Sequence, residues 1–61
     1  MQYEKNDRVK LNQDVTIESG TIAKGSVGTV TDVLITLKLY VVDFDNGQKG
    51  IKLLENRLEK A

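Results

Sequence analysis

The sequence predicts an all-β fold: a small barrel of five short strands, with one helical turn before the last strand. Two glycines, Gly25 and Gly28, stand at the start of the β-branched segment 22–33. A strand that bends sharply at a glycine can serve both sides of a very small barrel. Asn46-Gly47 lies between two alternating apolar and polar segments, which is the strongest short-range signal for a β-hairpin. Together these features indicate short strands joined by tight turns.

The N-terminal part of the chain contains one clear strand. Residues 1–5 are expected to form a mobile lead-in, in which Tyr3 is the one residue able to dock. In the segment 8–11, Val9 and Leu11 alternate with basic residues and therefore share one face of a strand. The first strand is expected there.

A long loop and a bent strand are expected next. The segment 12–24 contains two polar breaks and predicts a partly ordered loop. Its apolar residues are expected to turn inward: Val15, Ile17 and Ile22. In the second strand, 27–34, the residues Val27, Val30 and Val33 lie three apart, which suits neither a flat strand nor a helix. This spacing predicts a strand with a bulge or a strong bend.

The C-terminal half of the chain predicts three more strands. The remaining elements are expected as a strand at 40–44, a return strand at 48–53, a helical turn at 54–57 and a closing strand at 58–60. The segment 34–39 lacks Gly, Pro, Asn and Asp, so no turn signal separates the second strand from the third. Asn46-Gly47 is expected to form a type I′ turn with positive φ at both residues. The inward positions of the strands are expected to form the core: Val9, Leu11, Val27, Val30, Val42, Phe44, Ile51, Leu53 and Leu58.

Composition limits the classes of function. The 61 residues suit a single domain, 1–61, near the lower size limit for independent folding. Cys and His are absent, which excludes disulfides, thiolate metal ligands and an imidazole base. Nine basic residues balance nine acidic ones, so no net field attracts nucleic acid or an anionic membrane. Since no segment approaches the ~20 apolar residues of a membrane helix and no signal peptide is recognisable, we expect a cytoplasmic protein without membrane contact.

Three segments carry a resemblance to known proteins: NDRVKL at 6–11, KGSVGTV at 24–30 and YVVDF at 40–44. They resemble small bacterial SH3-like barrel proteins, and the likeness spans 7–58. The same framework is similar to the KOW motifs of ribosomal and transcription proteins. It is also similar to the small barrel subunits that accompany ferredoxin-dependent enzymes. The resemblance implies a five-stranded SH3-like barrel, an architecture that carries many unrelated functions.

Nucleic-acid binding is one function that this resemblance suggests. Lys24-Gly25 and Gly28 could form a KOW-type loop that contacts RNA, but the same residues suit the entrance of a bent strand. Recognition of RNA uses a basic stripe with aromatic residues for base stacking. In this chain the lysines are interleaved with aspartates. The strand entrance is therefore the favoured interpretation, and nucleic acid is not the favoured partner.

No catalytic, metal or cofactor site is predicted. Asp43, Asp45 and Gly47 resemble the start of a calcium loop, in which the glycine stands at the sixth position. Here the glycine is fifth, and Leu54 occupies the twelfth position, where an acidic residue is needed. One SH3-like family, the type II dihydrofolate reductases, is enzymatic, but this chain has Lys52 and Leu54 where that family has the Gln and Tyr of its pore motif. We therefore expect a protein that is not an enzyme.

The expected function is a non-catalytic protein–protein interaction module, or a small accessory subunit, that binds another protein or a second copy of itself as a homodimer. The alternative function is a KOW-like domain associated with nucleic acid or the ribosome. The expected partner-binding surface is an apolar cluster between the second and third strands: Leu34, Ile35, Leu37 and Leu39. The same cluster could instead fold over an open end of the barrel as a lid on the core.

Overall fold

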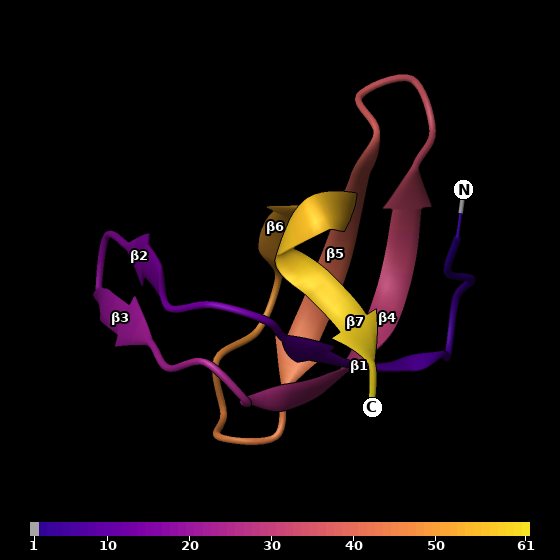
Figure 1. Ribbon diagram of the computed structural model, residues 1–61. Coiled ribbons are helices and arrows are strands. Elements are labelled where there is room, and N and C mark those ends of the chain that lie inside the picture. Colours follow the sequence, from indigo (N-terminus) through magenta and orange to yellow (C-terminus); the bar gives the residue numbers. More distant parts are fainter. Residues whose placement is uncertain (1) are drawn as a thin grey trace.

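The structure is a computed structural model that describes residues 2–61 (Figure 1). Within this range the chain forms seven strands and one 3-10 turn. They are β1 (Arg8–Leu11), β2 (Val15–Ile17), β3 (Gly20–Ile22), β4 (Val27–Leu34), β5 (Leu39–Phe44), β6 (Ile51–Leu54), η1 (Glu55–Arg57) and β7 (Leu58–Lys60).

Five of these strands form one antiparallel sheet in the order β6-β5-β4-β1-β7, and β2 pairs with β3 in a separate hairpin. The five strands predicted from the sequence are these five, and η1 is the helical turn predicted before the last strand. The prediction of a small all-β domain is therefore confirmed. In the described part of the chain, β6 and β7 end the sheet without pairing with each other, so hydrogen bonding does not close a barrel.

The segment 12–24 is more regular than expected, because it contains the β2–β3 hairpin. Ile17 pairs with Gly20 across a two-residue turn, and Val15 pairs with Ile22. The sequence gives little signal for β3, since Gly20 and Thr21 precede its single apolar residue. Ile22 is fully buried, as its expected inward direction requires.

A β-bulge in β4 reverses the direction of its side chains. The β4–β5 register shifts between Val30 and Asp32, which leaves Thr31 as the extra residue. Val30 therefore faces the core, and so does Val33, although the two lie three positions apart and would face opposite sides of a regular strand. Leu34 is turned to the opposite face. The bulge predicted from the three-residue spacing of the valines is confirmed.

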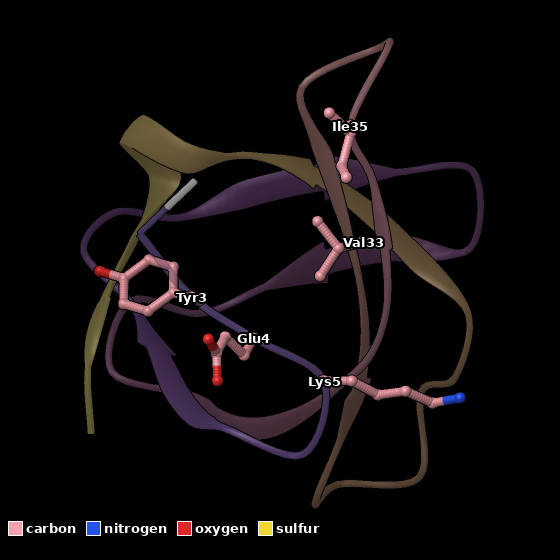
Figure 2. A pocket seen from close by; sticks show the side chains of 5 residues that line it. All are labelled: Tyr3, Glu4, Lys5, Val33 and Ile35. Atoms are coloured by element: carbon pink, nitrogen blue, oxygen red, sulfur yellow. The ribbon is translucent and has the colours of Figure 1, made fainter.

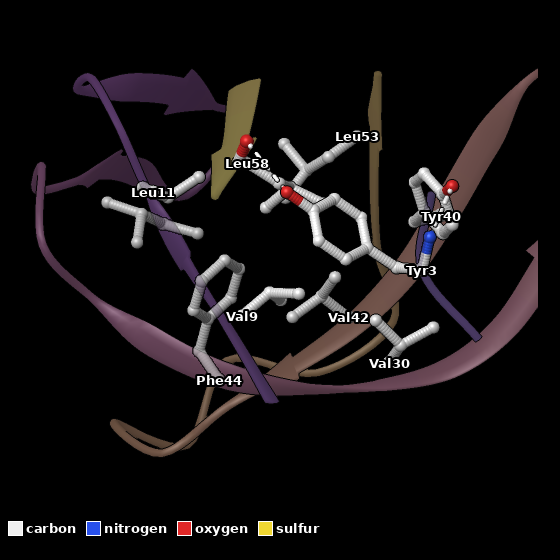
Figure 3. Packing of buried hydrophobic residues seen from close by; sticks show 10 residues of the cluster. Tyr3, Val9, Leu11, Val30, Tyr40, Val42, Phe44, Leu53 and Leu58 are labelled. Atoms are coloured by element: carbon white, nitrogen blue, oxygen red, sulfur yellow. Dashed lines mark hydrogen bonds between the residues drawn. The ribbon is translucent and has the colours of Figure 1, made fainter. Parts of the chain in front are cut away.

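The buried core differs from the predicted one in several residues, and Figure 3 shows how its side chains pack. Ten apolar side chains are buried: Tyr3, Val9, Leu11, Ile22, Val30, Tyr40, Val42, Phe44, Leu53 and Leu58. The prediction was wrong for Val27, which is half-buried on the other face of the sheet opposite Lys10. Ile51 is also only half-buried, although it packs against the core. Tyr3 and Tyr40 were missing from the expected core, and so was Ile22, which was expected only to turn inward.

The Asn46-Gly47 hairpin exists, but the predicted type I′ turn is wrong. Gly47 has a φ of 98°, whereas Asn46 does not have a positive φ. The amide of Gly47 donates to the carbonyl of Phe44 at 3.1 Å, and the amide of Phe44 donates to the carbonyl of Gln48 at 2.7 Å. These bonds define a three-residue connection that ends in a glycine of positive φ. The return strand starts at Ile51 rather than at residue 48.

The β4–β5 connection turns without any residue that favours turns. Residues 35–38 form the turn, in which the amide of Lys38 donates to the carbonyl of Ile35 at 3.2 Å. Lys38 takes a φ of 55°, which is unusual for a residue other than glycine. The tip projects beyond the rest of the sheet (Figure 1) and does not fold back as a lid.

Gly28 lies where β4 packs closely against β5, so a substitution there tests this packing. A Cβ atom at this position would lie 2.7 Å from the carbonyl oxygen of Asp43 and 2.7 Å from Cγ1 of Val42. We expect Gly28→Ala to lower the free energy of unfolding by about 1–3 kcal/mol, because the backbone of β5 must shift. Urea denaturation measures this change. Thr21→Ala on the exposed side of β3 is the control and should stay within about 0.5 kcal/mol of the wild type.

The hairpin geometry makes a second prediction. Gly47→Ala should cost about 1 kcal/mol, because the positive φ places Cβ against the backbone. Asn46→Gly should also destabilise, by roughly 0.5–1 kcal/mol, since Asn46 needs no positive φ and its side chain accepts a hydrogen bond from the amide of Gln48 at 3.0 Å. Thermal unfolding of both variants checks this. A neutral Asn46→Gly would indicate that the type I′ turn forms after all.

Candidate functional site

The face of the five-stranded sheet that points away from the core is built from four cross-strand rows. Residues directly opposite one another on neighbouring strands place their side chains on the same face. The rows are Glu59–Lys10–Val27, Arg8–Thr29–Asp43, Asp32–Val41–Lys52 and Leu34–Leu39–Leu54. Each of the first three rows contains one acidic and one basic side chain. The fourth row contains leucine alone.

We call this fourth row the leucine row: Leu34, Leu39 and Leu54. It crosses β4, β5 and β6 at the end of the sheet that carries the projecting tip. Leu34 and Leu39 are half-buried by their neighbours, and Leu54 is 45% exposed. Leu54 was not among the residues predicted to bind a partner, although the adjacent pair Leu53 and Leu54 is a usable signal: on a strand, only one of two neighbours can face the core.

The four residues predicted to bind a partner do not form one surface. Leu34 and Leu39 meet in the leucine row. Ile35 points to the other side of β4, where it lies near Val33 (Figure 2). Leu37 stands at the tip. Ile35 is 72% exposed and Leu37 is 63% exposed, so both are accessible to a partner.

Ile35 lines a shallow hollow of about 400 Å³ between the N-terminal segment and the end of β4 (Figure 2). The lining residues are Tyr3, Glu4, Lys5, Val33 and Ile35. The two charged side chains in this set are exposed and of opposite sign. The hollow offers mixed chemistry with no convergent set of polar groups.

The N-terminal segment is docked through Tyr3, and the expected mobile lead-in takes a defined path from residue 2 onward; Met1 lies outside the described residues. Tyr3 is 5% exposed, and its ring meets that of Tyr40 edge-on, with centroids 5.4 Å apart. The Tyr3 amide donates to the hydroxyl of Tyr40 at 3.0 Å, and the Tyr3 hydroxyl donates to the carbonyl of Leu58 at 3.3 Å (Figure 3). The Tyr40 hydroxyl in turn donates to Glu55 at 2.8 Å.

This network changes the acidity of its members. Burial raises the pKa of Tyr40 above its ordinary value, and the nearby Glu55 adds to the rise. Burial is also the main reason why the pKa of Tyr3 is raised. The hydrogen bond from Tyr40 lowers the pKa of Glu55, and the amide of Gln2 supports it at 3.2 Å. Neither tyrosine is therefore poised to act as a base near neutral pH.

Both aspartates of the segment that resembles a calcium loop already have hydrogen-bond partners within the protein. Asp45 forms a two-armed ion pair with Arg8, whose shorter contact is 2.6 Å and whose partners are both about half exposed. The hydrogen bond from Arg8 lowers the pKa of Asp45. Asp43 accepts a hydrogen bond from the amide of Gly50 at 2.9 Å. Among residues 2–61 no group of three or more acidic side chains is placed to hold a metal ion.

Comparisons of the chain with known protein families, with curated proteins and with solved structures find no match. Within the described range no helix is long and apolar enough to cross a membrane. The candidate site is therefore defined by geometry: the leucine row, with Leu37 at the adjoining tip.

Acid should weaken the N-terminal network and the hairpin ion pair. The pKa values of Glu55 and Asp45 in the folded protein lie below their ordinary values of 4.5 and 3.8. Their stabilising contributions are therefore fully present above the ordinary values and are lost as the pH falls through the lower folded values. Thermal melts between about pH 5 and pH 2 should show this loss. Tyr40→Phe should bring the pKa of Glu55 back toward 4.5 in an NMR titration, while that of Asp45 stays unchanged.

Proposed function

We propose that the protein is a non-catalytic docking module, an interaction domain or small accessory subunit, that binds a protein partner through the leucine row and the β4–β5 tip. One observation carries the proposal. On an outer face whose other three rows each contain an acid and a base, the row beside the projecting tip is purely apolar. Soluble monomers seldom keep such a contiguous apolar surface without a use for it.

We also infer that the architecture is that of an SH3-like barrel. The strand order supports this inference: β4, β5 and β6 follow one another as a meander, and β1 joins β7 to it. The bulged strand β4 and the 3-10 turn before the last strand are further features in its favour. The resemblance in the sequence segments points the same way.

The exposed area is sufficient for a modest affinity. Leu54 is 45% exposed and Leu37 is 63% exposed. Burying the remaining surface of these two side chains contributes about 2–3 kcal/mol at the usual gain for a large aliphatic residue. Fixed strand geometry also reduces the entropy that Leu34 and Leu39 lose on binding. A partner must add contacts of its own to reach a stable complex.

The charge distribution favours a protein partner over nucleic acid. Phosphate binding uses Lys and Arg that are free to neutralise several adjacent charges. Here the bases of the outer face stand in rows with acids, and Arg8 is held by Asp45. Catalysis has no support in the described residues either, because the buried hydroxyls of Tyr3 and Tyr40 are hydrogen-bonded and burial raises the pKa of both.

Site-specific photo-crosslinking tests the docking surface. A photoreactive residue in place of Leu37 or Leu54 should give a discrete adduct in a native lysate, because these side chains lie in the proposed interface. The same residue in place of Glu18, on the exposed β2–β3 turn, is the control and should give none. Adducts of equal yield from all three positions, or from none, would contradict the proposal. Leu39→Ala introduced beside the probe at 37 should reduce the adduct.

A further inference from the structure

We propose that the occupant of the leucine row is a second copy of this chain, in a two-fold dimer whose axis runs between two stacked outer faces, along the mean direction of the two β5 strands. This inference rests on the docking surface proposed above and specifies its partner. It is carried by the order of side chains in the row next to the leucine row.

That neighbouring row reads acid, apolar, base across the three strands: Asp32 on β4, Val41 on β5 and Lys52 on β6. Both charged side chains are exposed. Rotation by half a turn about this axis exchanges the positions of β4 and β6, which flank β5. It therefore places Asp32 of one copy over Lys52 of the other, and the same contact is made twice.

The same rotation also stacks the leucine row of one copy on the leucine row of the other. Leu39 lies on the central strand and would stack on its own counterpart, while Leu34 would face Leu54 of the second copy. Apolar side chains thus meet apolar side chains, and opposite charges flank them. An axis across the strands would stack each strand on itself and would gain nothing from this order of charges.

Asp43 limits how far the two sheet faces can overlap along β5. It also lies on β5, so the proposed axis brings it toward Asp43 of the second copy. Stacked sheets cross at about 30°, and Asp43 is four residues from Leu39, or roughly 13 Å along the strand. A crossing centred on Leu39 separates the two carboxylates, and the interface is therefore confined to the end of the sheet with the leucine row.

The size of this surface predicts weak association. A standard interface covers about 800 Å² of each partner, which is about a fifth of the 4014 Å² that this chain exposes. The ends of three strands and one turn cover less than that. We expect a dissociation constant between about 10 μM and 1 mM.

Sedimentation analysis of charge-reversal variants tests both the partner and the axis. Asp32→Lys and Lys52→Asp should each weaken dimerisation about fivefold to tenfold, because each places like charges opposite one another twice. The double variant restores the opposite charges and should return to within about twofold of the wild type. Glu59→Lys and Lys60→Asp change the net charge by the same amounts on β7, outside the interface, and should leave dimerisation unchanged.

Each outcome decides the proposal. Rescue by the double variant supports the axis, because weakened folding of the single variants would not be repaired by a second reversal. A wild type that stays monomeric at about 1 mM overturns self-association. If the crosslinks from positions 37 and 54 then join the chain to a different protein, the docking surface stands with another occupant. If none of the four charge reversals changes the dissociation constant of the dimer, the proposed axis is wrong.

Discussion

The β-bulge at Thr31 is the constraint on which both faces of the sheet depend. Strict alternation from Gly28 and Val30 would turn Asp32 and Leu34 toward the core. Burying an unpaired carboxylate is strongly unfavourable, so an unbulged β4 would conflict with its own sequence. The extra residue instead gives the inner position opposite Tyr40 to Val33 and sends Asp32 outward. It also places Leu34 outside, where it completes the leucine row.

The core depends on a side chain from outside the sheet. The strands supply aliphatic residues and only two rings, those of Tyr40 and Phe44. Tyr3 adds a third from the N-terminal segment, and a ring of this kind buries about 150–250 Å². Its polar atoms are satisfied by Leu58 and Tyr40, and Glu55 completes the network. One cluster therefore ties the chain start, the middle of the sheet and the closing strand together.

Features of the fold that have a local cause could be predicted from the sequence, whereas features that depend on distant residues could not. The valine spacing indicated the bulge, and Asn46-Gly47 indicated the hairpin, because turns and strand alternation are local properties. The exact turn depends on the pairing of Phe44 with Gln48, which lies outside the two-residue signal. The turn between β4 and β5 had no sequence signal, because Lys38 takes a positive φ that is unusual for a lysine. Nothing local shows where Tyr3 docks, and Leu54 joined the candidate site only when strand pairing was known.

The placement of charges explains why association would use a face of the sheet and stop at two copies. Sheet edges with unpaired backbone groups invite strand addition, and charged side chains oppose it. Lys52 lies on the edge strand β6, and Glu59 and Lys60 lie on the edge strand β7. Edge-to-edge pairing could propagate from copy to copy, whereas a two-fold contact between faces uses the same surface on both partners and is then closed. Folded protein is stabilised by such binding through mass action. For a chain of 61 residues without disulfides, that gain would come in the proposed dimer from the same leucines that leave the monomer incompletely covered.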